Sequence, residues 1–320
     1  MPDFVSPVAF VSVPVAPRFT TGRVVIHSDD GTAGDYTHWF PEFQAKHRVS
    51  QFLGKRLAPL CPSINSATIG GTNRMAWANV RAIEAAGGEI LSHGRYHLGY
   101  RDYPLIAAAD EGAEAVTVLE AYGSRVNGTA YGADPVAEGI THEIVEGEVA
   151  EIVTVTGNTA GVLSLAAPLA NAFTTAAVLR LSEAAMLANI TGCSDDAEAE
   201  GIAPIRHHVW TWHDRSATAK ARVSTIMDSA RAGDQQVNDP ASTVDFYDLD
   251  SRVDEGLTEA SIDTFLDTVQ STDGVLIVYG HGGTGETAVS NLRYLIAQCI
   301  ARGIRIVTHS EAVAYLQASD

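Results

Sequence analysis

Two aspartates and three histidines in this sequence have the residue types and the order expected of a metal-dependent hydrolytic site. Asp29 and Asp30 directly follow a short β-branched run. His93 and His97 follow a second apolar run, and His281 follows a third. One carboxylate and two imidazoles supply the three protein ligands of a catalytic zinc ion and leave a position for water. A second carboxylate beside such an ion would take the proton of that water, whose pKa the metal lowers.

Each motif taken alone also has an ordinary structural explanation. Asp-Asp-Gly is often only a turn, and a His-x-x-x-His pair can be two surface histidines one helical turn apart. The segment 93–97, HGRYH, has Gly94 where the zinc-protease motif has glutamate. The glycine-rich loop around His281 resembles a phosphate-binding loop but lacks its Gly-Lys-Ser/Thr ending. The interpretation therefore depends on the order of the motifs along the chain.

Alternating strands and helices are expected to position these residues. Apolar, β-branched runs predict strands at 23–28, 89–92, 205–212, 244–247, 274–280 and 304–308. Helical periodicity and capping residues predict helices at 36–46, 73–86, 182–200, 217–232, 258–270, 291–302 and 310–317. Repeated βα units predict a parallel sheet or barrel with its chemistry at the carboxyl ends of the strands.

The region from about 102 to 181 has a different texture. Its β-like stretches, separated by turn signals, are 115–122, 142–156, 161–165 and 176–181. It holds 11 acids and 2 bases, a local charge of −9. We interpret it as a β-rich insertion in a barrel made of residues 23–101 and 182–320. It either packs on the barrel and binds nothing or contacts another chain. Residues 1–22, interrupted by prolines, predict an extended arm with the same two alternatives.

Composition narrows the range of partners. The formal net charge is −18, from 21 bases and 39 acids, which argues against nucleic acid and anionic lipid. A neutral or amino-sugar glycan is easier to accommodate. No apolar run is long enough to span a bilayer, and the N-terminal residues lack the basic start of a signal peptide. The three cysteines lie far apart and indicate buried thiols rather than a disulfide framework.

The motifs, in this order, resemble those of the polysaccharide deacetylase (NodB homology) family. That family ends its first barrel strand with Thr-Phe-Asp-Asp-Gly, where residues 27–31 are His-Ser-Asp-Asp-Gly. Its Gly-His-Glu-Ile-Gly-Ser phrase and His-Ser/Thr-x-x-His motif are similar to residues 87–97, GGEILSHGRYH. Residues 274–281, GVLIVYGH, resemble the strand that carries its last histidine, and residues 75–86 and 303–314 resemble two flanking segments. The resemblance spans residues 22–101 and 182–320.

The resemblance implies a fold class and a set of roles. The fold would be α/β, a distorted (β/α) barrel of the NodB type with a small β-rich insertion. Asp29 would be the catalytic base and His281 the general acid. Asp30, His93 and His97 would bind a divalent metal, with zinc as the expected ion. Water activated by that metal would attack an acetyl carbonyl, N-linked or O-linked, on a glycan.

The match weakens at the third motif, usually Arg-x-Pro-aromatic-Gly, whose arginine orients the base. The counterpart at 209–215, VWTWHDR, has neither the proline nor the glycine. Trp210, Trp212 and Tyr96 are candidate substrate-binding residues, because aromatic rings stack on sugars. The alternative for the tryptophans is a place in the core or at its rim. Arg215 is the candidate replacement for the missing arginine. His27 is expected in the core, and His207, His208 and His309 receive no role.

These features leave more than one function open. The first is a metal-dependent deacetylase; the second is a glycan-binding or structural virion protein on a catalytically altered scaffold. A metal hydrolase acting on another substrate, such as a cyclic amide, is the third. The arm and the acidic insertion suit a component of a phage particle that meets a host surface polysaccharide outside the cell.

Overall fold

The structure, a computed structural model, describes residues 22–45, 58–127, 140–254, 257–282 and 286–319. The predicted N-terminal arm therefore lies outside the described residues, except for Gly22. Within them, no helix is both long and apolar enough to cross a membrane.

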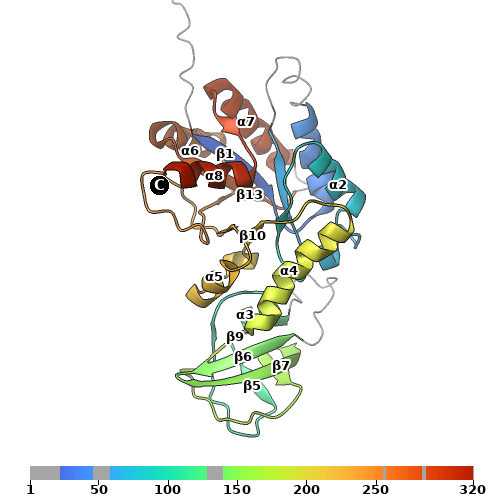
Figure 1. The fold of residues 1–320 in the computed structure, drawn as a ribbon, viewed down its shortest axis with the longest axis vertical. Coiled ribbons are helices and arrows are strands. Elements are labelled where there is room, and N and C mark those ends of the chain that lie inside the picture. Colours follow the sequence, from blue (N-terminus) through green and yellow to red (C-terminus); the bar gives the residue numbers. More distant parts are fainter. Residues whose placement is uncertain (1–21, 46–57, 128–139, 255–256, 283–285, 320) are drawn as a thin grey trace, which may run out of the picture.

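A curled parallel sheet forms the centre of the larger part of the molecule (Figure 1). Its strand order is β11-β10-β3-β2-β1-β13-β12, with β14 pairing beside β1. The strands are β1 (Arg23–Ser28), β2 (Leu60–Ile64), β3 (Leu91–Ser92), β10 (His207–Val209), β11 (Ser229–Arg231), β12 (Arg252–Val253), β13 (Val275–Gly280) and β14 (Arg305–Ile306). The central strands β1 and β13 are buried almost throughout, as their continuous apolar runs predict.

Helices pack against this sheet and enclose its core. They are α2 (Trp77–Ala85), α4 (Glu183–Ala199), α5 (Ala217–Val223), α6 (Glu259–Thr272), α7 (Glu286–Arg302) and α8 (His309–Ser319). Helix α6 begins as predicted, with Thr258 and Ser261 forming a reciprocal capping box. A main hydrophobic cluster lies between the strands and α2, α4, α6 and α7. Parallel strands with helices packed on them make an incompletely closed β/α barrel.

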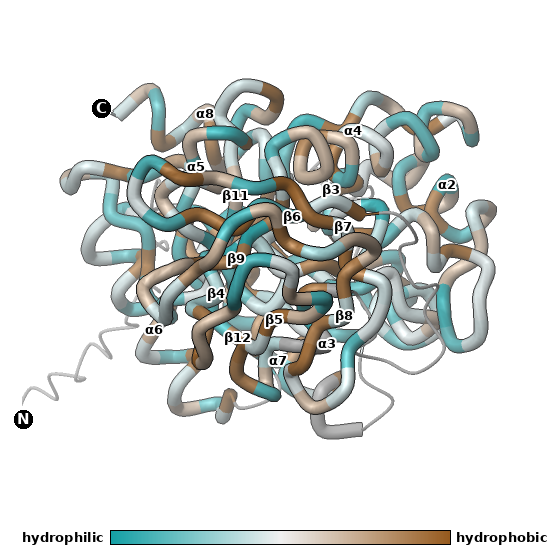
Figure 2. Tube along the Cα trace, turned by 90° about the horizontal axis from the view of Figure 1, so that it is seen from below, coloured by the Kyte–Doolittle hydropathy of each residue, from teal (hydrophilic) through white to brown (hydrophobic). Residues whose placement is uncertain are grey.

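A second, antiparallel sheet lies beyond one end of the barrel (Figure 1). Its order is β4-β9-β6-β7-β8-β5. The elements of this region are β4 (Tyr103–Pro104), β5 (Ala115–Thr117), α3 (Glu120–Asn127), β6 (Thr141–Glu146), β7 (Val149–Thr159), β8 (Val162–Leu165) and β9 (Val178–Leu181). It has a hydrophobic cluster of its own, and Figure 2 shows polar and apolar segments mixed along its strands. The predicted fold class, a distorted β/α barrel with an additional β-rich part, is confirmed, while the exact domain boundaries stay a prediction.

Three expected elements were wrong in part. The predicted helix at 217–232 ends at Val223, and residues 229–231 form the buried strand β11 instead. Residues 244–247 are not a strand; β12 occupies 252–253. The stretch 115–122 is a strand only to Thr117 and enters helix α3 at Glu120. The first difference matters most, because β11 pairs with β10 and so places its last residue, Arg231, inside the barrel.

Candidate metal centre and active site

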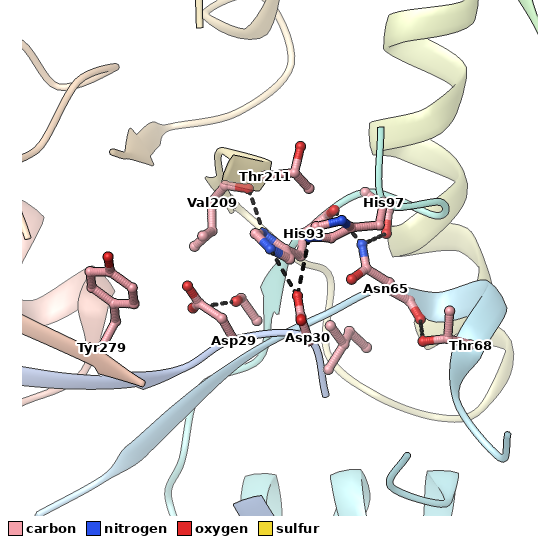
Figure 3. Close-up of polar contacts among 12 residues, drawn as sticks. Asp29, Asp30, Asn65, Thr68, His93, His97, Val209, Thr211 and Tyr279 are labelled. Atoms are coloured by element: carbon pink, nitrogen blue, oxygen red, sulfur yellow. Dashed lines mark hydrogen bonds and ion pairs between the residues drawn. The ribbon is translucent and has the colours of Figure 1, made fainter. Parts of the chain in front are cut away.

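Asp30, His93 and His97 meet at the carboxyl ends of β1 and β3, the two strands that flank β2 (Figure 3). Asp30 follows β1 with a left-handed backbone, φ 71°, and His93 follows β3. Within the described part of the chain this is the set of acids and histidines whose side-chain ligand atoms all lie within 4.8 Å of one another. Asp30 Oδ1 is 3.3 Å from His93 Nε2 and 3.2 Å from His97 Nε2. All three residues are buried.

The donor set fits a divalent cation. The ring atom His93 Nδ1 lies 2.8 Å from the carbonyl oxygen of Val209, which only accepts, so Nδ1 carries the hydrogen. In the neutral ring the Nε2 lone pair then faces Asp30 Oδ1, a buried oxygen that accepts no hydrogen bond among the described residues. Burial alone would raise the pKa of Asp30, but the two imidazoles beside it hold that pKa well below its usual range. Lone pairs that converge on one point call for a cation between them.

Asp29 is held as an anion next to this cluster. Arg231 Nη2 donates to both carboxylate oxygens at 2.5 Å, and Ser63 Oγ donates to Oδ1 at 2.8 Å. Arg231 is fully buried, with its guanidinium 4.4 Å from the centre of the Tyr279 ring. Burial would raise the pKa of Asp29, but the charge of Arg231, helped by His93 and His281, holds it well below its usual range. The carboxylate is therefore ionised at neutral pH, the form in which a general base must be.

His281 stands at the exposed side of the same site. It follows β13 directly, and its side chain is exposed. The backbone N–H of Asp29 donates to the carbonyl of Gly280 at 2.7 Å, and Thr32 Oγ1 lies 2.9 Å from the carbonyl of His281. These contacts tie the loop after β13 to the loop after β1. An exposed imidazole in this place can exchange a proton with a bound molecule or with water.

A strained segment forms the rim. Trp212 and His213, after β10, both have left-handed backbones, with φ 50° and 57°. The Trp212 ring meets the His97 ring edge-on at 4.1 Å, and His213 Nε2 lies 2.8 Å from the Tyr279 hydroxyl. Burial, followed by the charge of Arg231, lowers the pKa of His213 to about 4. Two adjacent non-glycine residues in this region cost energy, which the surrounding packing must offset.

The structure contradicts two of the four residues that were expected to bind substrate. Trp210 has no exposed surface, and its Nε1 donates to the carbonyl of Tyr247, so it belongs to the core. Arg215 pairs with Asp248 and Asp234 and does not orient the base. Half-buried Trp212 stays a candidate.

Tyr96 is half-buried, and its ring packs against the cluster that contains Leu98 and Met186. Its backbone N–H and carbonyl both bond the Asn189 side chain, at 2.8 and 3.0 Å. A role for Tyr96 in substrate binding therefore stays a prediction.

The residue that orients Asp29 was missed because the sequence assigns it to a helix. Arg231 ends a run of Ser, Ala and Arg residues that resembles the helix before it. A usable signal was present, since Arg231 precedes Gly233 in the way that Asp29 and Asp30 precede Gly31. A charged residue between a short run and a glycine turn marks the carboxyl end of a strand.

Gly94, where the family motif has Ser or Thr, has a structural reason. Its φ is +82°, and an added Cβ would lie 2.6 Å from Asn189 Nδ2 and 2.7 Å from the Tyr100 hydroxyl. The loop is held instead by Asn65 Nδ2, which donates to the carbonyl of His93 at 2.6 Å. Glycine at this position therefore allows the loop conformation that positions His93 and His97, and no serine or threonine side chain fits there.

Three other buried histidines, His27, His207 and His309, form a separate network inside the barrel. His207 Nε2 donates to Ser310 Oγ at 2.7 Å, because the Ser310 hydroxyl itself donates to Glu89. The same reasoning fixes the direction of every hydrogen bond in this network. From donor to acceptor it runs from His27 through His309, Ser229, His207 and Ser310 to Glu89. His27 is a core residue, as expected.

Fold and site together define the class of protein: an α/β protein with a distorted, open β/α barrel and a candidate metal centre at the carboxyl ends of its strands. A comparison of the sequence with protein-family models gave no match, and neither did a comparison with curated proteins.

Solved structures resemble the chain in overall arrangement. One is the carbohydrate-esterase (CE4) domain of a multidomain xylanase from the hindgut metagenome of Trinervitermes trinervoides, with 8% identity, 92% of this chain and 90% of that chain covered, and a TM-score of 0.46. A family 4 carbohydrate esterase from Streptomyces lividans has 10% identity, coverages of 89% and 92%, and a TM-score of 0.42. A peptidoglycan deacetylase from Bacillus subtilis has 9% identity, coverages of 95% and 94%, and a TM-score of 0.45.

Proposed function

We propose that this protein removes acetyl groups from a glycan by metal-dependent hydrolysis. The observation that supports this most directly is the pairing of a buried, arginine-held Asp29 carboxylate with the three-ligand cluster one residue further along. An anionic base next to a cation site is what hydrolysis by water requires.

Each residue has a definite task in the proposed reaction. Asp29 takes a proton from water at a carboxylate oxygen, and Arg231 keeps that oxygen ionised and aimed until then. His281 gives a proton to the leaving nitrogen or oxygen of the sugar. Water and the acetylated sugar thus yield acetate and a free amine or hydroxyl. Trp212, half-buried beside His97, offers a ring face to the sugar.

Asp30, His93 and His97 would hold the divalent metal through one carboxylate oxygen and two imidazole nitrogens. When bound, the ion supplies Lewis acidity, which lowers the pKa of water and stabilises negative charge on the acetyl oxygen. The N/O donor set is compatible with zinc, which we propose as the ion. The carbonyl of Val209, bonded to His93, keeps that ring in the tautomer that metal binding needs.

We further propose a setting outside the host cell, on a phage particle that meets a surface polysaccharide. The high negative charge supports an uncharged or cationic glycan rather than a polyanion. The antiparallel sheet exposes large apolar side chains, including Val149, Ile152 and Val162, as a chain that contacts a neighbour would. Cross-linking within an assembled particle tests this; a fully exposed antiparallel sheet there would contradict it.

The test of the activity is acetate release from acetylated glycans and chitooligosaccharides, with zinc-loaded and with chelated protein. Release that chelation abolishes and zinc restores supports the proposal. Glycan binding without release by the zinc-loaded protein would instead support the second hypothesis, a binding protein on an altered scaffold.

A further inference from the structure

The loop that carries His281 is pressed against the loop that follows β1. An added Cβ on Gly34 would lie 1.8 Å from the carbonyl oxygen of Gly282. An added Cβ on Gly282 would lie 2.1 Å from Asp35 Oδ1. The two backbones are therefore in direct contact, with no space for a side chain between them. The position of His281 depends on how this contact is held.

Within the described residues, the hydroxyl group of Thr32 bridges the two loops. Thr32 Oγ1 lies 2.9 Å from Asp35 Oδ1 and 2.9 Å from the carbonyl oxygen of His281. A threonine hydroxyl has one hydrogen to donate, and a carbonyl oxygen has none. Both contacts are hydrogen bonds only if the carboxyl group of Asp35 carries a proton. Asp35 then donates to Thr32, and Thr32 donates to His281.

The surroundings of Asp35 favour this neutral form. The residue has no exposed surface, and its Oδ2 accepts no hydrogen bond among the described residues. Burial raises the pKa of Asp35 well above its usual range. The hydrogen bonds of Thr32 lower that pKa, but the nearby carboxylates of Asp30 and Asp29 raise it again, and the net shift is upward. A buried, half-paired carboxylate would be costly as an anion, whereas a neutral acid can serve as a donor.

We propose that Asp35 is a positioning residue that acts as a neutral acid, fixing the main chain of His281 through Thr32. Asp35 opens the π-helical turn η1 (Asp35–Trp39), and its backbone N–H donates to the carbonyl of Thr32 at 3.2 Å, so donor and hydroxyl belong to one rigid unit. This unit sets where the imidazole of His281 stands relative to Asp29. The inference rests on the proposed function, because that function makes the place of the imidazole matter.

Matched variants separate this role from general stability. Asp35→Asn keeps a neutral donor of the same shape, whereas Asp35→Ala removes the donor. Thr32→Ser keeps the hydroxyl, and Thr32→Val removes it. We expect kcat to fall roughly 10- to 100-fold in Asp35→Ala and Thr32→Val, with KM changed less than about threefold, since a misplaced group loses this much. Asp35→Asn and Thr32→Ser keep kcat within about threefold of wild type.

A second measurement does not depend on the activity. The NMR signal of the His281 ring is assigned by its absence in His281→Gln. Its chemical shift depends on the surroundings of the ring and so reports the position of the loop. We expect it to keep its position in Asp35→Asn and to move towards that of free imidazole in Asp35→Ala, with zinc affinity unchanged in both. If no glycan is hydrolysed even by wild type, the proposed function fails, and the NMR comparison still decides whether Asp35 holds the loop.

Two outcomes would overturn the inference. If kcat or the His281 signal changed as much in Asp35→Asn as in Asp35→Ala, a charged carboxylate would be needed. Asp35→Ala behaving like wild type in both would show that Asp35 does not position His281. The free energy of unfolding, measured for every variant, identifies any that fails simply by losing its fold.

Discussion

Arg231 and Asp29 are 202 positions apart in the chain, yet the guanidinium Nη2 lies 2.5 Å from both oxygens of the carboxylate. Neither side chain is more than 5% exposed. Removing one partner of such a pair leaves a buried charge uncompensated, which costs about 3–5 kcal/mol. This pair determines both the charge of the proposed base and the stability of the barrel around it.

We predict that Arg231→Gln lowers kcat at least about 100-fold, because the base loses both its orientation and its charge partner. The loss of a positive charge also raises the pKa of Asp29, so the acid limb of the pH profile moves to higher pH. The matched control is Arg215→Gln, which breaks the partly exposed pairs with Asp234 and Asp248. Arg215→Gln should change kcat less than about fivefold, as expected for a weakly coupled pair. Equal losses in the two variants would contradict the assignment of Arg231.

Asn65→Ala should weaken zinc binding by roughly 10- to 100-fold, because Asn65 supports the backbone of the His93 loop without touching the metal. Titration of the metal-free protein with zinc measures this. Thr191→Ala is the control, because its hydroxyl donates to the carbonyl of Leu187 within helix α4. An unchanged zinc affinity in Asn65→Ala would show that the loop holds its shape without this amide.

Gly94→Ser, which brings the sequence closer to the family motif, should destabilise the protein by about 2–4 kcal/mol through a strained backbone and a forced contact. Gly87→Ser is the matched control: its φ is +94°, but an added Cβ meets nothing within 4 Å. The control should therefore show the backbone cost alone, about 1 kcal/mol. Urea unfolding of both variants tests this, and a stabilised Gly94→Ser would refute the account of that loop.

Stability should fall as the pH drops below about 6.5, because burial lowers the pKa of His27, His208 and His309 well below the ordinary value near 6.5. Below pH 6.5 these histidines bind protons in the unfolded chain but not in the folded one. Their contribution to the free energy of unfolding is therefore complete above pH 6.5 and is lost on acidification. Each such histidine contributes up to about 1.4 kcal/mol per pH unit. Urea unfolding of chelated protein between pH 7.5 and 4.5 measures the slope. A flat profile would mean that these histidines accept protons in the folded state.

Much of the site was visible in the sequence, because its residues directly follow strong signals. Asp30, His93 and His97 come after buried runs, and parallel pairing of β1, β2 and β3 brings such positions to one edge. Their roles stay predictions, but their proximity follows from the order of the strands.

Arg231 was missed, because its place before Gly233 was a weaker signal than the helical propensity around it. Its strand is three residues long, lacks β-branched residues and follows an alanine-rich helix, so local propensity favours helix. Pairing with β10 overrides that preference, and pairing of this kind is a tertiary effect. The contact of Asp35 and Thr32 with the His281 loop was hidden for the same reason, since hydrogen-bonding groups 249 positions apart meet only in the folded barrel.

The most direct test of the proposed function is the rate of acetate release by wild type and by Asp29→Asn at equal zinc occupancy. Asparagine keeps the shape of the side chain but cannot take a proton. The account predicts that Asp29→Asn binds zinc as wild type does and releases acetate at least about 1000 times more slowly, as loss of the essential base requires. Equal rates of release at equal occupancy would contradict it, because Asp29 would then not be the base.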